Sequence, residues 1–199
     1  LACTYTCSGL TAYSALKKIK SRADGGKLLV IGAGGVGLAA MAIAKSVTNA
    51  EIYVADIDPE KREAGLKAGA VAAIDPSDKA AFKAFMGETG GGVNAAIDFV
   101  GAESSAAFGV KVLAKGGKLV IVGLFGGSFS MPLPMFPIKA IGVEGSYVGN
   151  LQEMRELMDL AKAGKLSKLA ITPRPLAEAH KTLEDLRKGK IVGRVVLQS

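Results

Sequence analysis

The fold is decided by the stretch Lys27-Leu-Leu-Val-Ile-Gly-Ala-Gly-Gly-Val-Gly-Leu-Ala-Ala-Met-Ala-Ile-Ala-Lys45, in which an apolar run passes through glycines into alanine-rich sequence. Residues 28–31 are apolar but too few to form a helix, so this run predicts a buried strand. The alanine-rich part has good helix propensity. The stretch therefore predicts a strand, a glycine turn and a helix, in that order.

The glycines of this turn follow the spacing Gly32-x-Gly34-x-x-Gly37. In a strand-turn-helix unit, Gly32 permits the tight turn, Gly34 lets the backbone approach a pyrophosphate, and Gly37 lets helix and strand pack closely. The free N–H groups at the start of the helix favour an anion. The spacing alone is weak evidence in a chain with 26 glycines, because a glycine-rich turn can also bind nothing.

The segment that follows supports dinucleotide binding. It reads as a second strand and ends in Asp56, nineteen positions after Gly37, which is close to the spacing of a ribose-binding carboxylate. Such a carboxylate accepts hydrogen bonds from ribose hydroxyls and repels a 2′-phosphate, which favours NAD over NADP. Ile57 is apolar where an NADP enzyme often has arginine, while Lys61 and Arg62 are a mild counterweight.

Strands and helices alternate along most of the chain. After the first strand, further strands are predicted at residues 51–56, 71–74, 93–100, 117–123 and 140–147. Such alternation is typical of an α/β protein with a parallel sheet covered on both faces and with ligands at the carboxyl ends of the strands. We therefore expect a doubly wound six-stranded parallel sheet. The tail departs from the pattern, with predicted extended, helical and strand segments at 170–176, 177–188 and 191–197.

The connection 124–139 interrupts the alternation. Within it, Met131-Pro-Leu-Pro-Met-Phe-Pro137 is predicted to form neither a regular helix nor a central strand, because proline lacks a backbone donor. We expect this apolar connection to be exposed, and exposed apolar patches commonly mark subunit interfaces. The following strand, expected at a sheet edge, offers unpaired backbone groups to a second copy. Residues 131–147 are therefore predicted to form a homodimer or higher homo-oligomer.

Composition fits a soluble globular protein, with 199 residues of which 49% are apolar and 22% charged. Neither a membrane span nor a signal peptide is expected. The net charge of +7 divides into +4 for residues 1–30, −1 for 31–149 and +4 for 150–199. Because the excess lies at the two ends and not in one basic stripe, no nucleic-acid partner is expected. The absence of an initial methionine predicts a fragment of a longer protein.

Other reactive side chains give weaker signals. Cys3 and Cys7 lie four apart and make no CxxC pair, so a reduced, cytoplasmic setting is expected. Tyr13 and Lys17 have the spacing of the proton-transfer pair of short-chain dehydrogenases, but they precede the glycine turn, so we interpret them as one helix face. His180 is the single histidine. It is far in sequence from the turn and is interpreted as a surface or packing residue.

Several strings, in their order along the chain, resemble the zinc-dependent medium-chain alcohol dehydrogenases: Cys7-Ser-Gly-Leu-Thr-Ala-Tyr13, Gly32-Ala-Gly-Gly-Val-Gly37, Gly145-Ser-Tyr-Val-Gly-Asn150 and Gly189-Lys-Ile-Val-Gly-Arg-Val-Val196. The resemblance covers most of the chain, but family members begin with a catalytic domain that this sequence lacks. It implies a remnant of that domain at 1–9, an NAD-binding Rossmann domain at 10–163 and a segment returning toward the catalytic domain at 164–199.

The resemblance also implies roles for individual residues. Cys7 matches the third protein ligand of the catalytic zinc, so the chain by itself should not hold that metal, which needs three ligands. Thr11 and Val36 match positions that flank the nicotinamide ring, and Arg194 matches a pyrophosphate contact. Backbone groups near Val122, Leu124 and Ser146 match those that hold the carboxamide. The cofactor residues expected from the turn and from the resemblance are Thr11, Gly32, Gly34, Gly35, Val36, Gly37, Asp56, Ile57, Lys61, Val100, Val122, Leu124, Ser146 and Arg194.

The leading hypothesis is the NAD(H)-binding domain of a zinc-dependent alcohol dehydrogenase, which interconverts alcohols and aldehydes or ketones by hydride transfer. In the complete family enzyme, zinc acts as a Lewis acid on the alcohol oxygen. The chain alone is expected to bind cofactor without catalysis. Two alternatives stay open. A zinc-free quinone or enoyl reductase would use NADPH, against which Asp56 and Cys7 argue. A non-enzymatic NAD(H)-sensing or assembly module is the other.

Overall fold

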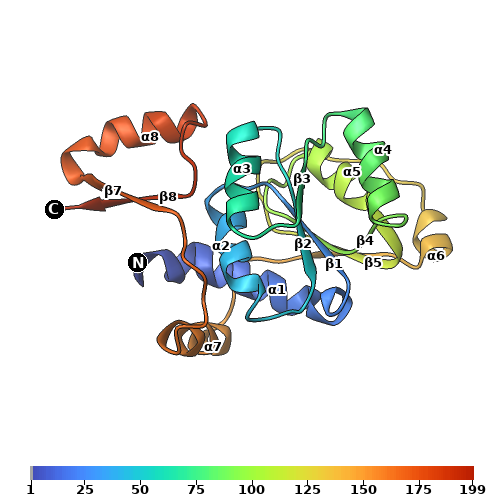
Figure 1. Cartoon of the computed structure of the whole chain (residues 1–199), viewed down its shortest axis with the longest axis horizontal. Helices are drawn as coiled ribbons and strands as arrows, with labels where there is room; N and C mark the ends of the chain where they lie inside the picture. Colours follow the sequence, from blue (N-terminus) through green and yellow to red (C-terminus); the bar gives the residue numbers. More distant parts are fainter. Residues whose placement is uncertain (1) are drawn as a thin grey trace.

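A six-stranded parallel sheet forms the centre of the protein, whose computed structural model describes residues 2–199 (Figure 1). The strand order is β3-β2-β1-β4-β5-β6, so the direction of winding reverses between β1 and β4. This confirms the predicted doubly wound six-stranded sheet. The strands are β1 Lys27–Ile31, β2 Glu51–Ala55, β3 Ala72–Ile74, β4 Val93–Asp98, β5 Leu113–Ile121 and β6 Gly142–Gly145.

Helices cover both faces of the sheet, because each central strand sends alternate side chains to opposite sides. In β1, Leu28 and Val30 enter the core beneath one layer of helices, and Leu29 and Ile31 enter the other core. The first layer contains α1 Leu10–Ala23, α2 Gly35–Ala44, α3 Pro59–Lys67 and α7 Leu151–Lys162. The second contains α4 Lys79–Glu88, α5 Glu103–Lys111 and α6 Met135–Lys139.

Polar side chains begin several of these helices at defined residues. Asp58 caps α3 by accepting from the backbone N–H of Glu60 (2.9 Å), with Pro59 at the first helical position. Asn150 and Glu153 form a reciprocal capping box at the start of α7, with both bonds 2.9 Å long. Each cap satisfies backbone donors that have no partner within the helix. The caps thus fix the residues at which α3 and α7 begin.

The structure differs most from the sequence prediction at β5 and in residues 131–137. β5 begins at Leu113, whereas the strand was expected from residue 117; Leu113 pairs with Val93 before the register shifts. Gly116 with φ +76° turns the chain within this strand. The prediction that residues 131–137 contain no helix is wrong, because α6 begins at Met135. Pro137 is tolerated there because it falls in the first turn, where the backbone N–H has no helical partner.

The tail forms a small separate unit beside the sheet, at the same end of the molecule as both termini (Figure 1). β7 Ile171–Pro175 and β8 Arg194–Gln198 pair in parallel, and α8 Ala179–Arg187 connects them. The elements were predicted, but their pairing was not. His180 is exposed on α8 beside Glu184 (3.5 Å). At the other end, η1 Ala2–Thr4 and η2 Tyr5–Gly9 run into α1. Across residues 2–199 we find no helix long and apolar enough to cross a membrane.

Tyr13 and Lys17 fasten α1 to α7. The Tyr13 hydroxyl donates to Oε2 of Glu156 (2.9 Å), and Nζ of Lys17 lies 2.6 Å from the same oxygen. Tyr13 is buried at this contact between the two helices. The pair is therefore a helix face that contacts another helix, in agreement with the interpretation from sequence.

This contact predicts a measurable tyrosine titration. Burial first, and then the bond to the Glu156 carboxylate, raises the pKa of Tyr13 to about 12. Because the folded-state pKa lies above the unfolded value near 10, this group's stabilisation is complete below pH 10 and is lost as the pH rises toward 12. We expect the absorbance of tyrosinate to show an ionisation near pH 12 that Tyr13→Phe removes. A titration unchanged by Tyr13→Phe would contradict the assignment.

Candidate functional site

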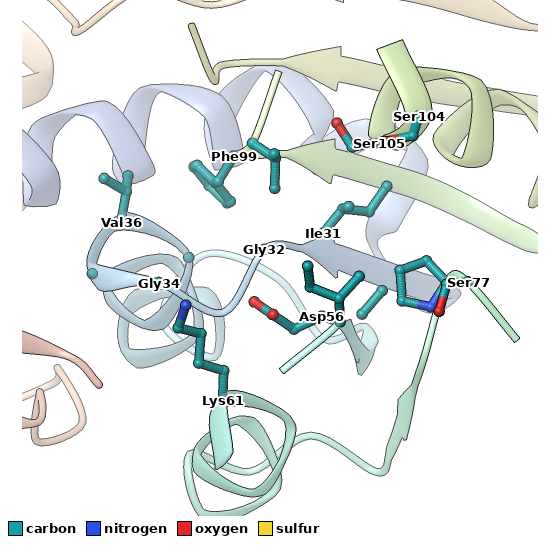
Figure 2. A pocket seen from close by; sticks show the side chains of 16 residues that line it. Ile31, Gly32, Gly34, Val36, Asp56, Lys61, Ser77, Phe99, Ser104 and Ser105 are labelled. Atoms are coloured by element: carbon teal, nitrogen blue, oxygen red, sulfur yellow. The ribbon is translucent and has the colours of Figure 1, made fainter. Parts of the chain in front are cut away.

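A cavity of about 440 Å³ lies at the carboxyl ends of β1, β2 and β4, where the strand order reverses (Figure 2). This is the place where open parallel sheets bind ligands. The glycine turn, the segments after β2, β3 and β4 and the start of α5 form its walls. Its lining residues are Ile31, Gly32, Gly34, Gly35, Val36, Gly37, Ala55, Asp56, Ile57, Lys61, Pro76, Ser77, Phe99, Val100, Ser104 and Ser105.

The three motif glycines occupy different environments in this turn. Gly32 has φ +89°, and its N–H donates to the carbonyl of Ala55 (2.8 Å). A Cβ on Gly37 would overlap the carbonyl oxygen of Gly32, so α2 packs on the turn only because this side chain is absent. A Cβ on Gly34 would meet no atom within 4 Å. Backbone at Gly34 is therefore open to a ligand, beside the N-terminus of α2, which attracts anions.

Asp56 is held in a fixed orientation at the end of β2. Its Oδ2 accepts from the N–H of Ala33 in the turn (2.8 Å), and its Oδ1 accepts from the N–H of Asp58 (2.9 Å). Figure 2 shows the Asp56 carboxylate directed toward the turn, and Lys61 reaching from α3 toward Gly34. The cavity therefore presents a carboxylate and an ammonium group on one side of the open glycine backbone.

Arg194 reaches the same turn from the far end of the sequence. Its backbone begins β8, and its side chain lies against Gly35, where a Cβ would overlap Cδ of Arg194. Gly35 opens α2, so the guanidinium stem lies beside a helix N-terminus. The cation adds to the partial positive charge of the helix and favours an anionic ligand. The structure thus brings together two residues that are far apart in the chain.

Arg194 and four other expected cofactor residues are not among the residues that line this cavity. Val122 and Ser146 are buried, Thr11 is half-buried, and Leu124 is 80% exposed. Val122, Leu124 and Ser146 follow β5 and β6, further along the same edge of the sheet. Within residues 2–199, Oγ of Ser146 is buried and has no hydrogen-bond partner. An unpaired buried hydroxyl costs about 1–3 kcal/mol, so this atom fits a polar ligand group.

Asp98 is a site residue that the sequence analysis missed. It is fully buried at the end of β4. Its Oδ1 accepts from the N–H groups of Val100 (2.8 Å) and Gly101 (3.0 Å), and its Oδ2 accepts from Oγ of Ser105 (2.7 Å). These bonds fix the wall formed by Val100 and the start of α5. The signal was present, because Asp98 follows an apolar strand just as Asp56 does. Other lining residues not predicted are Ile31, Ala55, Pro76, Ser77, Phe99, Ser104 and Ser105.

The described residues do not fit a catalytic zinc site. Cys7 lies in η2, and both Cys7 and Cys3 are exposed free thiols. No cluster of three or more His, Cys, Asp or Glu side chains in residues 2–199 is placed to hold a metal ion. A catalytic zinc needs three protein ligands, so Cys7 alone is insufficient.

The comparisons with known proteins agree with this geometry. The model of the zinc-binding dehydrogenase family matches residues 35–163. The chain belongs to this family. An NAD-dependent alcohol dehydrogenase of Sulfurisphaera tokodaii is 38% identical over 98% of this chain and 57% of the relative. The chain thus spans about half the length of the curated relatives it matches.

Two solved structures extend the family likeness to three dimensions. The alcohol dehydrogenase of Aeropyrum pernix has a TM-score of 0.90 and 34% identity, over 98% of this chain and 57% of that one. The acetophenone reductase of Geotrichum candidum, solved in complex with NAD, has a TM-score of 0.83 and 26% identity, over 100% and 55% of the two chains. The resemblance noted from the sequence strings is thereby confirmed.

Proposed function

We propose that this chain is the NAD(H)-binding domain of a zinc-dependent alcohol dehydrogenase, an oxidoreductase that interconverts alcohols and aldehydes or ketones by hydride transfer. The observation that carries this proposal is the convergence of an open glycine turn and a fixed Asp56 carboxylate on one cavity. We assign residues 10–163 to the cofactor domain. Residues 1–9 and 164–199 are assigned to the catalytic part of the longer enzyme.

In this proposal the cavity holds the adenosine and pyrophosphate half of the cofactor. The backbone at Gly34 and Gly35 and the cation of Arg194 bind the pyrophosphate, and Lys61 adds positive charge nearby. Asp56 accepts hydrogen bonds from the ribose hydroxyls. These groups are in place before the cofactor arrives, because backbone bonds already orient Asp56.

The nicotinamide half extends toward the ends of β5 and β6. Val36 and Val100 line the cavity on that side, and the unpaired hydroxyl of Ser146 supports a polar ligand group near residues 122–124. Thr11, Val122 and Leu124 are proposed contacts of this half. When bound, the nicotinamide ring accepts or donates the hydride, while these residues bind and orient it.

The names of the relatives support the cofactor and the substrate class. The Sulfurisphaera tokodaii relative is named as NAD-dependent, and the Geotrichum candidum structure contains NAD. Small alcohols and carbonyl compounds are the substrates proposed for the longer enzyme. Cys7 is proposed as one of its zinc ligands. The purified chain is expected to bind NADH without oxidising alcohols, since residues 2–199 hold no complete metal site.

Substitution of Asp56 tests the cofactor assignment. The unaltered chain is expected to bind NADH more tightly than NADPH. Asp56→Asn is expected to weaken NADH binding roughly tenfold, because a charged acceptor for the ribose hydroxyls is lost. The ratio of the NADPH to the NADH dissociation constant is expected to fall in this variant. Fluorescence titration with both cofactors measures this. Asp24→Asn is the matched control, since Asp24 does not line the cavity and asparagine keeps an oxygen for the N–H of Asn49. Equal affinities of the unaltered chain for the two cofactors would refute the NAD assignment.

We also propose a homodimer that uses residues 131–147, and a cytoplasmic location. β6 is an edge strand of the sheet, and Leu133 and Ile138 beside it are 78% and 67% exposed. An edge strand with neighbouring apolar side chains favours pairing with a second copy. The two free thiols fit a reducing compartment. Sedimentation is expected to show dimers, and monomers alone at high concentration would contradict the first proposal.

A further inference from the structure

Arg62 lies at the start of the helix that borders the proposed ribose site, but its guanidinium is already occupied. Nη1 of Arg62 donates to the carbonyl oxygens of Asp56 (2.8 Å) and Ile57 (2.9 Å), and to Oδ2 of Asp75 (3.1 Å). The side chains of Arg62 and Asp75 are only 23% and 27% exposed. The Arg62 guanidinium is therefore held on the backbone of the cavity wall that follows β2.

Asp75 is itself fixed in place. It follows β3 directly, and its Oδ1 accepts from the N–H (2.9 Å) and the hydroxyl (2.6 Å) of Ser77. These two bonds, and then the charge of Arg62, keep the pKa of the Asp75 carboxyl below its usual value, so the group is charged at neutral pH. Ser77 lines the cavity. Asp75 thus connects Arg62 to a residue of the proposed adenosine site.

Near the proposed ribose position, the cations of α3 are paired with carboxylates, whereas the Asp56 carboxylate is not paired with a cation of residues 2–199. Lys61 lies 3.7 Å from Oδ2 of Asp58, and Arg62 is paired with Asp75. Among the described residues, Asp56 forms no ion pair and is held by backbone N–H groups. Both cations on this turn of α3 have a carboxylate partner, whereas the ribose-facing carboxylate has no cation. A 2′-phosphate would therefore meet the charge of the Asp56 carboxylate, in a cavity where the Arg62 guanidinium is not among the lining groups.

We propose that Asp75 is a specificity-determining positioning residue, which excludes NADP(H) by holding the Arg62 guanidinium on the carbonyls of Asp56 and Ile57, away from a ribose 2′-phosphate. The inference rests on the proposed NAD(H) site and goes beyond it, because it assigns part of the cofactor choice to a residue that does not line the cavity. Without Asp75, the guanidinium keeps its charge and loses its carboxylate partner. An arginine beside the ribose is what binds a 2′-phosphate in NADP-dependent proteins of this fold type.

Fluorescence titration of the full chain with NADH and NADPH tests this with Asp75→Asn, Arg62→Gln and the double variant. Asp75→Asn is expected to raise the affinity for NADPH relative to NADH about tenfold, which is the size of one removed charge interaction near a protein surface. Arg62→Gln alone is expected to leave that ratio nearly unchanged. In the double variant the gain is expected to disappear, because the released cation is absent.

A matched control is Asp185→Asn in the C-terminal unit. Asp185 lies 2.8 Å from Nη1 of Arg174, and their side chains are 20% and 24% exposed. The substitution therefore breaks a similar ion pair whose two residues do not line the cavity. It is expected to leave the cofactor ratio unchanged. Should Asp75→Asn fail to fold, Ser77→Ala removes one bond to Asp75 and is expected to shift the ratio in the same direction, by roughly threefold.

The outcomes separate this inference from the proposed function. If the unaltered chain binds no NADH, the proposed function falls and the inference falls with it. If the chain binds NADH but the ratio is the same in Asp75→Asn, the inference alone is overturned. A gain that persists in the double variant also overturns it, because the change would then come from the lost carboxylate and not from Arg62.

Discussion

Gly37→Ala is expected to destabilise the chain by about 3 kcal/mol and to abolish NADH binding, because backbone atoms occupy the space that a Cβ would need. The added carbon would overlap the carbonyl oxygen of Gly32 and lie 3.4 Å from Cγ1 of Val30. A carbonyl in a tight turn cannot rotate away as a side chain can. The N-terminus of α2 must therefore move off β1, which changes the backbone that faces the cavity. Urea unfolding and NADH fluorescence titration measure the two effects.

Gly34→Ala is the matched control for this prediction. Gly34 has φ −76° and ψ −167°, which any residue can adopt, and a Cβ there would meet no atom within 4 Å. The variant is expected to fold with unchanged stability, but its methyl group would enter the proposed pyrophosphate site and weaken NADH binding at least tenfold. Unchanged binding in Gly34→Ala would contradict the phosphate cradle. Unchanged stability in Gly37→Ala would contradict the packing role.

The order of strands and helices along the chain could be predicted because its signals are local. Each central strand is a short apolar run, and glycines and capping residues such as Asp58 mark where strands end and helices begin. The pairing of β7 with β8 could not be predicted in this way, because α8 separates the two strands and their contact is set by tertiary packing. α6 was missed because Pro134 and Pro137 were interpreted without their positions, at the N-cap and in the first turn of the helix.

The residues of the candidate site likewise differ in whether local sequence signals could predict them. Three glycines and one carboxylate of the site lie at or between the consecutive elements β1, α2 and β2, so their spacing alone predicted that they share one site. They are Gly32, Gly34, Gly37 and Asp56. The walls formed by residues after β3 and β4 come from elements distant in sequence. No spacing rule connects them to the turn. Arg194 was placed by resemblance to a family, and only the fold shows why a residue of β8 reaches Gly35.

Asp98 was missed although it ends an apolar strand, because it belongs neither to the glycine turn nor to the strings that resemble the family. Asp98→Ala is expected to lower the free energy of unfolding by about 4 kcal/mol, since three donors lose their acceptor inside the protein. These donors are the N–H groups of Val100 and Gly101 and the hydroxyl of Ser105. Urea unfolding gives the free energy, and NADH titration reports whether the cavity wall at Val100 has moved.

Two further variants separate the causes of that loss. Asp78→Ala removes an exposed aspartate that accepts from two backbone N–H groups at the start of α4, so it should cost only about 1 kcal/mol. Asp98→Asn keeps an oxygen for Val100 and Gly101, and Ser105 can accept from the new amide, so roughly half of the stability should return. If Asp98→Ala lowers the free energy of unfolding by no more than Asp78→Ala does, the burial of Asp98 does not strengthen the hydrogen bonds that it accepts. If Asp98→Asn is as unstable as Asp98→Ala, the negative charge itself, and not an acceptor of the right shape, holds the wall of the cavity.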